Sequence, residues 1–288
     1  MAEAPRSLER AAVVGAGTMG SGIAQVLAAA GIPVTLIDVE PRQLERARAT
    51  IERSLGRFVQ KGTLSAAARD AALARVTFAP ALGAAAGAGL LVEAVVEDRD
   101  VKRSVLREAA DLLPESALLA SNTSSLSITA LGAGLPHPER VVGMHFFNPV
   151  PLMALVEVVR GERSSEAAIV AAVGLAQRLG KTPVVVNDYP GFVSNRILLP
   201  MLNEAFYTLM EGVAEKSAID QVMRLGMNHP MGPLQLADLI GLDVCLHILE
   251  VLHRDLGDDK YRPCPLLRRM VAAGKLGRKS GAGFYEYG

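Results

Sequence analysis

Two side chains in the middle of the chain have the types and the spacing of an acid–base pair. His145 ends the apolar run Val141–His145, and Glu157 lies inside a second run, Leu155-Val156-Glu157-Val158-Val159. A carboxylate between aliphatic residues is unfavourable to bury unless it is paired. If the two runs form antiparallel strands, Glu157 comes within hydrogen-bond reach of His145 and orients it as a general base. A structural histidine bonded to a backbone carbonyl is an alternative of equal weight from spacing alone.

A glycine-rich segment near the start of the chain has the spacing of a phosphate-binding loop. Gly15-Ala16-Gly17-Thr18-Met19-Gly20 follows an apolar run and opens a helical stretch. Gly15 allows a tight turn, Gly17 lets the backbone approach a pyrophosphate, and Gly20 allows close helix–strand packing. The helix N-terminus favours the phosphates. We therefore predict that Gly15, Gly17, Thr18, Met19 and Gly20 bind a dinucleotide; a glycine turn without a ligand is the weaker alternative.

The residue that ends the next apolar run indicates which dinucleotide is bound. Asp38 follows Pro33–Ile37, and its carboxylate can accept both adenosine ribose hydroxyls while repelling a 2′-phosphate. This favours NAD over NADP. Arg42, four residues further on, leaves some use of NADP open. A P-loop is excluded here because no Gly-Lys-Ser/Thr ending follows the glycines.

Two further polar residues are candidates for contacts with a substrate. Ser124, in Ser121-Asn-Thr-Ser-Ser-Leu126, follows an apolar run, where open α/β sheets bind ligands. It can donate to a substrate oxygen, or Ser124 or Ser125 can cap a helix. Asn195 opens the last third of the chain and can act as an amide donor, or it makes an ordinary interhelical contact.

The composition excludes several classes of function. Lys plus Arg and Asp plus Glu number 30 each, so the formal net charge of zero argues against nucleic acid as a partner. Two cysteines cannot build a disulfide framework and favour a reducing compartment. The absence of Trp disfavours stacking platforms. The apolar runs are too short for a membrane span or a signal sequence, so we expect a cytoplasmic protein.

Short apolar runs alternate with helical stretches through the first part of the chain. This alternation predicts an α/β fold, a Rossmann-type, mostly parallel sheet with helices on both faces. The stretch 141–160 holds two strand-like runs with no room for a helix between them, which predicts an antiparallel edge. The expected helices are Met19–Ala30, Pro41–Gln60 and Asp100–Leu112. The expected strands are Ala11–Gly15, Pro33–Asp38, Val76–Phe78, Leu90–Glu93, Ala117–Ala120, Val141–His145 and Pro183–Asn187.

The pattern changes at Asp188-Tyr-Pro-Gly191. Beyond it no strong strand pattern remains until the last few residues, and Gly and Pro separate helical stretches. We expect residues 1–188 to form an NAD-binding domain and residues 189–288 an all-helical domain. The expected helices of this second domain are Phe192–Glu211, Ala218–Leu225, Pro233–Leu252 and Pro265–Ala273.

Several motifs in order along the chain resemble those of the 3-hydroxyacyl-CoA dehydrogenases, in particular the bacterial 3-hydroxybutyryl-CoA dehydrogenases. The resemblance covers about Arg10 to Tyr287, and its motifs together are far more specific than the glycine pattern alone. They are Gly-Ala-Gly-Thr-Met-Gly-Ser-Gly-Ile-Ala from Gly15, Glu93-Ala-Val-Val-Glu97-Asp98, Ser121-Asn-Thr-Ser-Ser-Leu126, Gly143-Met-His-Phe-Phe-Asn-Pro149, Asp188-Tyr-Pro-Gly-Phe192 with Asn195-Arg196, His229-Pro-Met-Gly-Pro233 and Gly283-Phe-Tyr-Glu-Tyr287.

The resemblance implies a role for each matching residue at the reacting centre. His145 matches the family's catalytic base, and Glu157 matches its dyad partner. Ser124 and Asn195 match residues that hold the substrate's 3-oxygen and the histidine. The implied reaction is the reversible oxidation of an (S)-3-hydroxyacyl-CoA, with NAD taking the hydride.

Further residues match contacts to NAD and to CoA. Glu97, Lys102 and Asn148 match positions near the nicotinamide end of NAD. Ser54 and Lys61 match contacts to CoA, and their spacing of seven puts both on one face of a helix, where a basic side chain can meet phosphates. A solvated helix face is the alternative for these two. The family also pairs its helical domains into homodimers, so the resemblance implies that residues 189–288 serve substrate binding and dimerisation. No metal site is expected.

Two other functions stay open at this point. A dehydrogenase of a free hydroxy acid or sugar acid, of the gulonate dehydrogenase type, would keep the NAD site and the His145–Glu157 pair but not depend on CoA. A non-catalytic NAD-binding protein would keep only the cofactor site. The pair Phe146-Phe147 and the region of Lys61 favour the CoA substrate.

Overall fold

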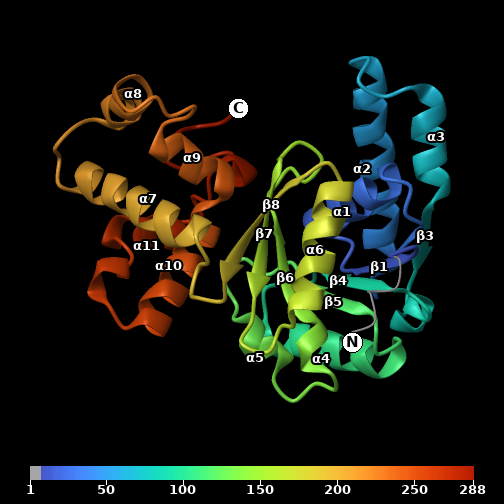
Figure 1. Cartoon of the computed structure of the whole chain (residues 1–288). Helices are drawn as coiled ribbons and strands as arrows, with labels where there is room; N and C mark the ends of the chain where they lie inside the picture. Colours follow the sequence, from blue (N-terminus) through green and yellow to red (C-terminus); the bar gives the residue numbers. More distant parts are fainter. Residues whose placement is uncertain (1–7) are drawn as a thin grey trace. The chain divides into compact units, whose positions relative to one another are not determined.

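The computed structural model describes residues 8–288, which form two compact units (Figure 1). The first unit ends at Asp188, and the second runs from Tyr189 to Gly288. The first unit is built on an eight-stranded sheet in the order β3-β2-β1-β4-β5-β6-β7-β8. Its strands are β1 (Ala11–Val14), β2 (Val34–Ile37), β3 (Val76–Ala79), β4 (Leu90–Glu93), β5 (Leu118–Ser121), β6 (Val141–Phe146), β7 (Leu155–Arg160) and β8 (Thr182–Asn187).

The sheet is mostly parallel, as the alternation of strands and helices predicted. Strands β1 to β6 all run in one direction, so their carboxyl ends meet at one edge. Strand β7 pairs antiparallel with β6, and β8 then pairs parallel with β7. The predicted antiparallel edge is therefore present, and it consists of two strands because β8 lies outside β7.

Successive side chains of each strand point to opposite faces of the sheet. Val13, Val92 and Val142 share one hydrophobic core with residues of α1, α2, α3 and α6. Because side chains alternate along a strand, the neighbouring positions point to the other face of the sheet. Glu93 and His145 occupy such positions. The first unit's α-helices are α1 (Thr18–Ala29), α2 (Pro41–Gln60), α3 (Ala66–Ala74), α4 (Arg99–Leu112), α5 (Ile128–Gly132) and α6 (Glu166–Arg178).

The second unit is helical, and one predicted helix is divided in two. The apolar pattern predicted one helix over 233–252, but α9 ends at Ile240 and α10 begins at Leu242. Gly241 between them has φ of 107°, a conformation that ends a helix and that glycine adopts without strain. The α-helices of this unit are α7 (Ser194–Met210), α8 (Lys216–Gly226), α9 (Pro233–Ile240), α10 (Leu242–Leu256) and α11 (Pro265–Ala272).

A buried carboxylate ties the end of the chain to the helices of the second unit. Asp238 of α9 is 1% exposed and accepts hydrogen bonds from the amides of Phe284 and Tyr285, both at 2.9 Å. The hydroxyl of Tyr287 donates to the same carboxylate at 3.0 Å. The chain from Gly283 passes so close that a Cβ on this glycine would lie 2.0 Å from Asp238 Oδ1.

Replacing Asp238 with alanine should destabilise the second unit. The change leaves two buried amides without an acceptor, and we expect the free energy of unfolding to fall by about 3 kcal/mol. Urea unfolding followed by circular dichroism measures this. As a control, Asp255→Asn removes a carboxylate of the same unit that pairs with its neighbour Arg254 at the surface, and it should change the free energy by less than about 1 kcal/mol. Equal effects of both changes would contradict this role of Asp238.

Candidate active site

The antiparallel pair β6–β7 brings the predicted acid–base pair together. His145 and Glu157 are register partners across the two strands. His145 Nδ1 lies 2.8 Å from Glu157 Oε2, and both residues are buried. A neutral imidazole whose Nδ1 bonds to a carboxylate carries its proton there and its lone pair on Nε2. In this arrangement the Glu157 carboxylate holds the His145 imidazole in the tautomer that can act as a base.

Neighbouring groups fix the position of the imidazole further. The ring of Phe147 contacts the ring of His145, with centroids 4.5 Å apart. Asn122, just beyond β5, accepts a hydrogen bond from the Phe146 amide at 2.9 Å through its Oδ1. The end of β5 is thereby joined to the backbone next to His145.

The glycine loop after β1 has the geometry that a dinucleotide requires. Gly15 has φ of 102°, and a Cβ there would meet Ala94 O at 2.5 Å. A Cβ on Gly20 would lie 1.7 Å from Gly15 O, so the start of α1 packs directly on the loop. Apart from Gly17 and its two chain neighbours, no heavy atom of the described chain lies within 4 Å of the Cβ position of Gly17. A pyrophosphate can therefore approach the backbone at Gly17, while Thr18 and Met19 open the helix behind it.

Asp38 stands at the end of β2, beside this loop. Its Oδ2 accepts from the Ala16 amide at 2.7 Å and its Oδ1 from the Glu40 amide at 2.9 Å. Each carboxylate oxygen has a second lone pair, so these bonds leave acceptor capacity for ribose hydroxyls. Asp38 thus also stabilises the glycine loop, a function that its place in the sequence did not reveal.

The loop after β5 is gathered around one carboxylate from the loop after β4. Glu97 Oε1 accepts from Thr123 Oγ1 at 2.5 Å and from the Ser124 amide at 2.9 Å. Ser124 Oγ donates to the same oxygen at 3.3 Å. Helix capping by Ser124 or Ser125 is wrong, because Ser127 caps α5 by accepting from the Ala130 amide at 3.1 Å.

Lys102 of α4 approaches Glu97 from the buried side. Its Nζ lies 3.1 Å from Glu97 Oε2, and the lysine is 1% exposed. Burial by itself would raise the pKa of Glu97, but the Lys102 ammonium and the hydrogen bonds from Thr123 and Ser124 outweigh burial and hold this pKa below its usual value. Glu97 is therefore an anion that organises the Ser124 loop.

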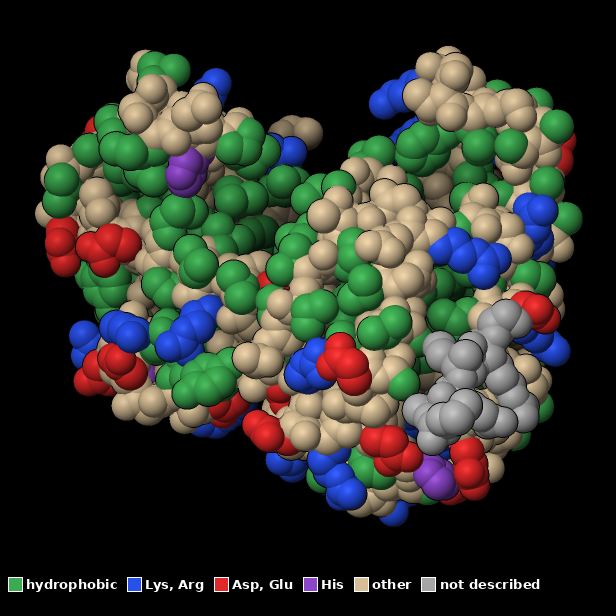
Figure 2. All heavy atoms as spheres, in the orientation of Figure 1, with side chains coloured by type: hydrophobic (Ala, Val, Ile, Leu, Met, Phe, Trp, Pro, Cys, Tyr) green, Lys and Arg blue, Asp and Glu red, His purple; other side chains and the backbone are tan. Residues whose placement is uncertain are grey.

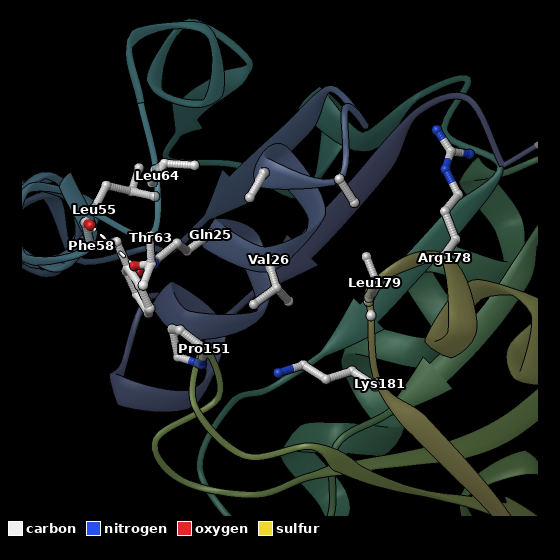
Figure 3. Close-up of a pocket in the computed structure, with 13 residues that line it drawn as sticks. Gln25, Val26, Leu55, Phe58, Thr63, Leu64, Pro151, Arg178, Leu179 and Lys181 are labelled. Atoms are coloured by element: carbon white, nitrogen blue, oxygen red, sulfur yellow. Dashed lines mark hydrogen bonds between the residues drawn. The ribbon is translucent and has the colours of Figure 1, made fainter. Parts of the chain in front are cut away.

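Asn148 lies in the turn between β6 and β7, and a lysine holds that turn. Lys181, just before β8, donates from Nζ to Val150 O at 2.6 Å and to Met153 O at 2.7 Å. A groove of about 380 Å³ runs between α1, α2 and the end of α6, and both Lys181 and Pro151 line it (Figure 3). None of the predicted site residues lines this groove.

The remaining predicted residues lie far from His145 and Glu157 in the sequence. Their roles in binding substrate stay predictions. Ser54 is half-buried in α2, and Lys61 is exposed directly after that helix. Asn195 is buried in the first turn of α7, in the second unit. The backbone amide of Asn195 donates to Gly191 O at 3.1 Å, and this bond sets the start of the helix.

Known families account for nearly the whole chain. Residues 10–189 match the NAD binding domain of 3-hydroxyacyl-CoA dehydrogenase, and residues 191–287 match the C-terminal domain of the same enzyme family. The chain belongs to the 3-hydroxyacyl-CoA dehydrogenase family. This confirms the resemblance carried by the motifs and, through the N-terminal match, NAD as the cofactor.

Individual relatives of this 3-hydroxyacyl-CoA dehydrogenase family member are similar over their full length. A probable 3-hydroxybutyryl-CoA dehydrogenase of Deinococcus radiodurans is 54% identical over 275 residues, 96% of this chain and 99% of the relative. The 3-hydroxybutyryl-CoA dehydrogenase of Bradyrhizobium diazoefficiens is 50% identical, over 97% of this chain and 96% of the relative. The crystal structure of (S)-3-hydroxybutyryl-CoA dehydrogenase from Ralstonia eutropha superposes with a TM-score of 0.94 at 46% identity, covering 98% of this chain and all 100% of that one.

Sequence reasoning missed several residues that organise this family member's site. Glu93 and Ser121, which end β4 and β5, are fully buried and bonded to each other, and Lys181 holds the Asn148 turn. One signal was available, because Glu93 follows the apolar run Leu90-Leu91-Val92 and a buried carboxylate needs partners. Lys181 has no such signal, since its acceptors are backbone carbonyls.

Two further findings concern metal binding and membrane-spanning helices. Within residues 8–288 there is no cluster of three or more His, Cys, Asp and Glu side chains arranged to hold a metal ion. None of the helices formed by these same residues is both long enough and apolar enough to cross a membrane.

Replacing Asp38 with serine should weaken discrimination between the two dinucleotides. The change removes the carboxylate that accepts ribose hydroxyls and repels a 2′-phosphate, and we expect the ratio of the Kd of NADPH to that of NADH to fall at least about 10-fold. Titration calorimetry of the purified protein with each dinucleotide measures both constants. An unchanged ratio would contradict the assignment of Asp38.

Proposed function

We propose that the protein catalyses the reversible oxidation of (S)-3-hydroxyacyl-CoA to 3-oxoacyl-CoA, with short-chain 3-hydroxybutyryl-CoA as substrate. The observation that carries the proposal is the buried His145–Glu157 pair, 2.8 Å apart, at the carboxyl edge of the sheet that also bears the glycine loop. The substrate class follows the family and the relatives of Deinococcus radiodurans and Ralstonia eutropha.

In the oxidation direction His145 removes the proton of the 3-hydroxyl group. Its Nε2 receives the proton, and the imidazolium that forms is stabilised by Glu157 through Nδ1. Glu157 is buried between the aliphatic side chains of β7, which makes its attraction for the charged ring stronger than in water. In the reduction direction the same pair returns the proton to the 3-oxygen.

Ser124 holds the 3-oxygen in this proposal. Its backbone amide and its hydroxyl both approach Glu97 Oε1, so the loop presents the serine in one orientation. When substrate binds, the hydroxyl hydrogen of Ser124 turns from Glu97 Oε1 to the 3-oxygen, while the backbone amide keeps its bond to Glu97. A donor held in this way aligns proton and hydride removal in one geometry. Asn195 carries the corresponding role in the family, and for this chain it stays a prediction.

The two remaining groups of predicted residues bind the cofactor and CoA. NAD, when bound, accepts the hydride from C3 of the substrate at its nicotinamide ring. The backbone at Gly17 and the start of α1 receive its phosphates, and Gly15 and Gly20 shape the loop that holds them. Glu97, Lys102 and Asn148 border its nicotinamide end. Ser54 of α2 and Lys61 directly after that helix contact CoA, whose binding remote from the reacting carbon helps to position that carbon.

His145→Gln should leave the fold intact and lower kcat for acetoacetyl-CoA reduction about 10²–10⁴-fold, since glutamine cannot transfer the proton. Stopped-flow or steady-state oxidation of NADH at 340 nm measures this. His253→Gln is the matched control. It changes a histidine at the surface that pairs with Asp259 at 3.0 Å, and its kcat should stay within about 2-fold of wild type.

The same assay distinguishes the alternatives. Turnover of NADH only with the CoA ester supports the proposal, whereas turnover with free acetoacetate would support a dehydrogenase of a free acid. Binding of NADH without turnover of either substrate would support a non-catalytic protein. Full activity of His145→Gln would exclude His145 as the base.

We propose that the second unit joins two copies into a homodimer. Large apolar side chains are exposed on it, among them Ile197 (67%), Val213 (70%) and Leu225 (73%), and Figure 2 shows hydrophobic side chains gathered on this unit. Exposed apolar patches of this kind are typical of interaction surfaces. The family is the further ground for a second copy as the partner.

Light scattering coupled to gel filtration should give about twice the mass of one chain at micromolar concentration. Dilution into the nanomolar range should leave that mass unchanged, because an interface of apolar side chains between identical copies is usually stable. A mass of one chain at micromolar concentration would exclude the homodimer.

We also place the protein in the cytoplasm. Cys245 and Cys264 are both free and buried, and burial raises the pKa of the Cys245 thiol to about 12. Reduced cysteines are the rule in a reducing compartment.

A further inference from the structure

We infer that Glu93 is a positioning residue for the reaction: it holds the Ser124 loop and the glycine loop in register with each other. This inference rests on the proposed function, because it assigns Glu93 an effect on the turnover that Ser124 supports. Glu93 itself is placed near no reacting atom. It acts through the groups to which it is bonded.

Both oxygens of the Glu93 carboxylate are occupied. Oε1 accepts from the Val95 amide at 2.7 Å and from Lys102 Nζ at 2.8 Å. Oε2 accepts from Ser121 Oγ at 2.6 Å. Glu93 is 0% and Lys102 1% exposed, so water does not compete for these bonds. Three donors on a fully buried carboxylate define its position closely.

Two chains of contacts lead from this carboxylate to the Ser124 loop. In the first, Lys102 Nζ also lies 3.1 Å from Glu97 Oε2, and Glu97 Oε1 accepts from the Ser124 amide. In the second, Ser121 Oγ accepts from the Thr123 amide at 3.3 Å. The loop is therefore tied to Glu93 at two adjacent residues, Thr123 and Ser124.

A third set of contacts leads to the glycine loop. The register of the sheet places Glu93 opposite Val14 of β1 on one side and Ser121 of β5 on the other. The backbone that follows Glu93 packs on Gly15, whose Cβ position lies 2.5 Å from Ala94 O and 2.9 Å from the Val95 nitrogen. The bond from the Val95 amide to Glu93 fixes this turn. Glu93 therefore lies where the proposed cofactor loop and the substrate loop meet.

The charges around Lys102 explain why a neutral side chain cannot replace Glu93. Glu93 and Glu97 share the one ammonium of Lys102, which is held between them. In Glu93→Gln the lysine keeps only Glu97 as an anionic partner, and the amide group cannot accept from Ser121 and Val95 at once with both of its polar atoms. Lys102 then shifts toward Glu97, and the Ser124 loop loses its second anchor.

The test is a double-mutant cycle on kcat for acetoacetyl-CoA reduction. Glu93→Gln should lower kcat about 10–100-fold and change KM for acetoacetyl-CoA less than about 3-fold, because it displaces a reacting contact without touching CoA. In the Ser124→Ala background the same change should lower kcat less than about 3-fold, since the contact it positions is already gone. An equal loss in both backgrounds would overturn the inference.

Two further variants keep the result decisive. Ser121→Ala removes the bond to Glu93 Oε2 and the bond that the Thr123 amide donates to Ser121 Oγ. If Glu93→Gln does not fold, the same non-additivity with Ser124→Ala is expected of Ser121→Ala. Asp220→Asn is the matched control. It alters a buried carboxylate of the second unit that accepts from the Leu234 and Gln235 amides and the Tyr285 hydroxyl. It should lower Tm yet keep kcat within about 2-fold.

The outcomes separate this inference from the proposed function. A wild-type protein that does not turn over acetoacetyl-CoA would overturn the proposed function and this inference with it. An active wild type whose Glu93→Gln and Ser121→Ala variants show full kcat would overturn the inference alone.

Discussion

Charged side chains that are buried at one edge of the sheet must find partners there, and this requirement shapes the whole candidate site. Glu157 is satisfied by His145, and Glu93 by Lys102, Ser121 and the Val95 amide. An unpaired carboxylate in these positions would be unfavourable by several kcal/mol, on the order of the stability of a domain. These pairings therefore stabilise the fold, and one of them, His145–Glu157, is also the pair proposed to transfer the proton.

The sheet supplies these partners because its strands end together. Strands β1, β4, β5 and β6 are parallel neighbours, so the loops that follow them meet at one edge. The glycine loop, the Glu97 loop, the Ser124 loop and the Asn148 turn are those four connections. The chain then reverses, and β7 pairs antiparallel with β6, which places Glu157 opposite His145.

Local patterns predicted most of the elements and the contact between His145 and Glu157. The apolar runs and the glycine spacing predicted the strands and the tight turn between β1 and α1, because burial on both faces and a tight turn each demand particular residue types in order. The pair His145–Glu157 was predictable because a carboxylate in an apolar strand needs a nearby partner. The break at Gly241 was missed, since the apolar periodicity of α9 and α10 is continuous and only the backbone conformation divides them.

The sequence by itself determined the family, the order of the elements, the glycine loop and the residue types available for proton transfer. Only the tertiary structure decided that Glu97 gathers the Ser124 loop, that Lys102 lies between two carboxylates, and that Ser127 rather than Ser124 caps α5. The physical reason is that a local motif specifies conformation over a few residues, whereas a buried polar group takes whichever partner the packed strands and helices bring within about 3 Å.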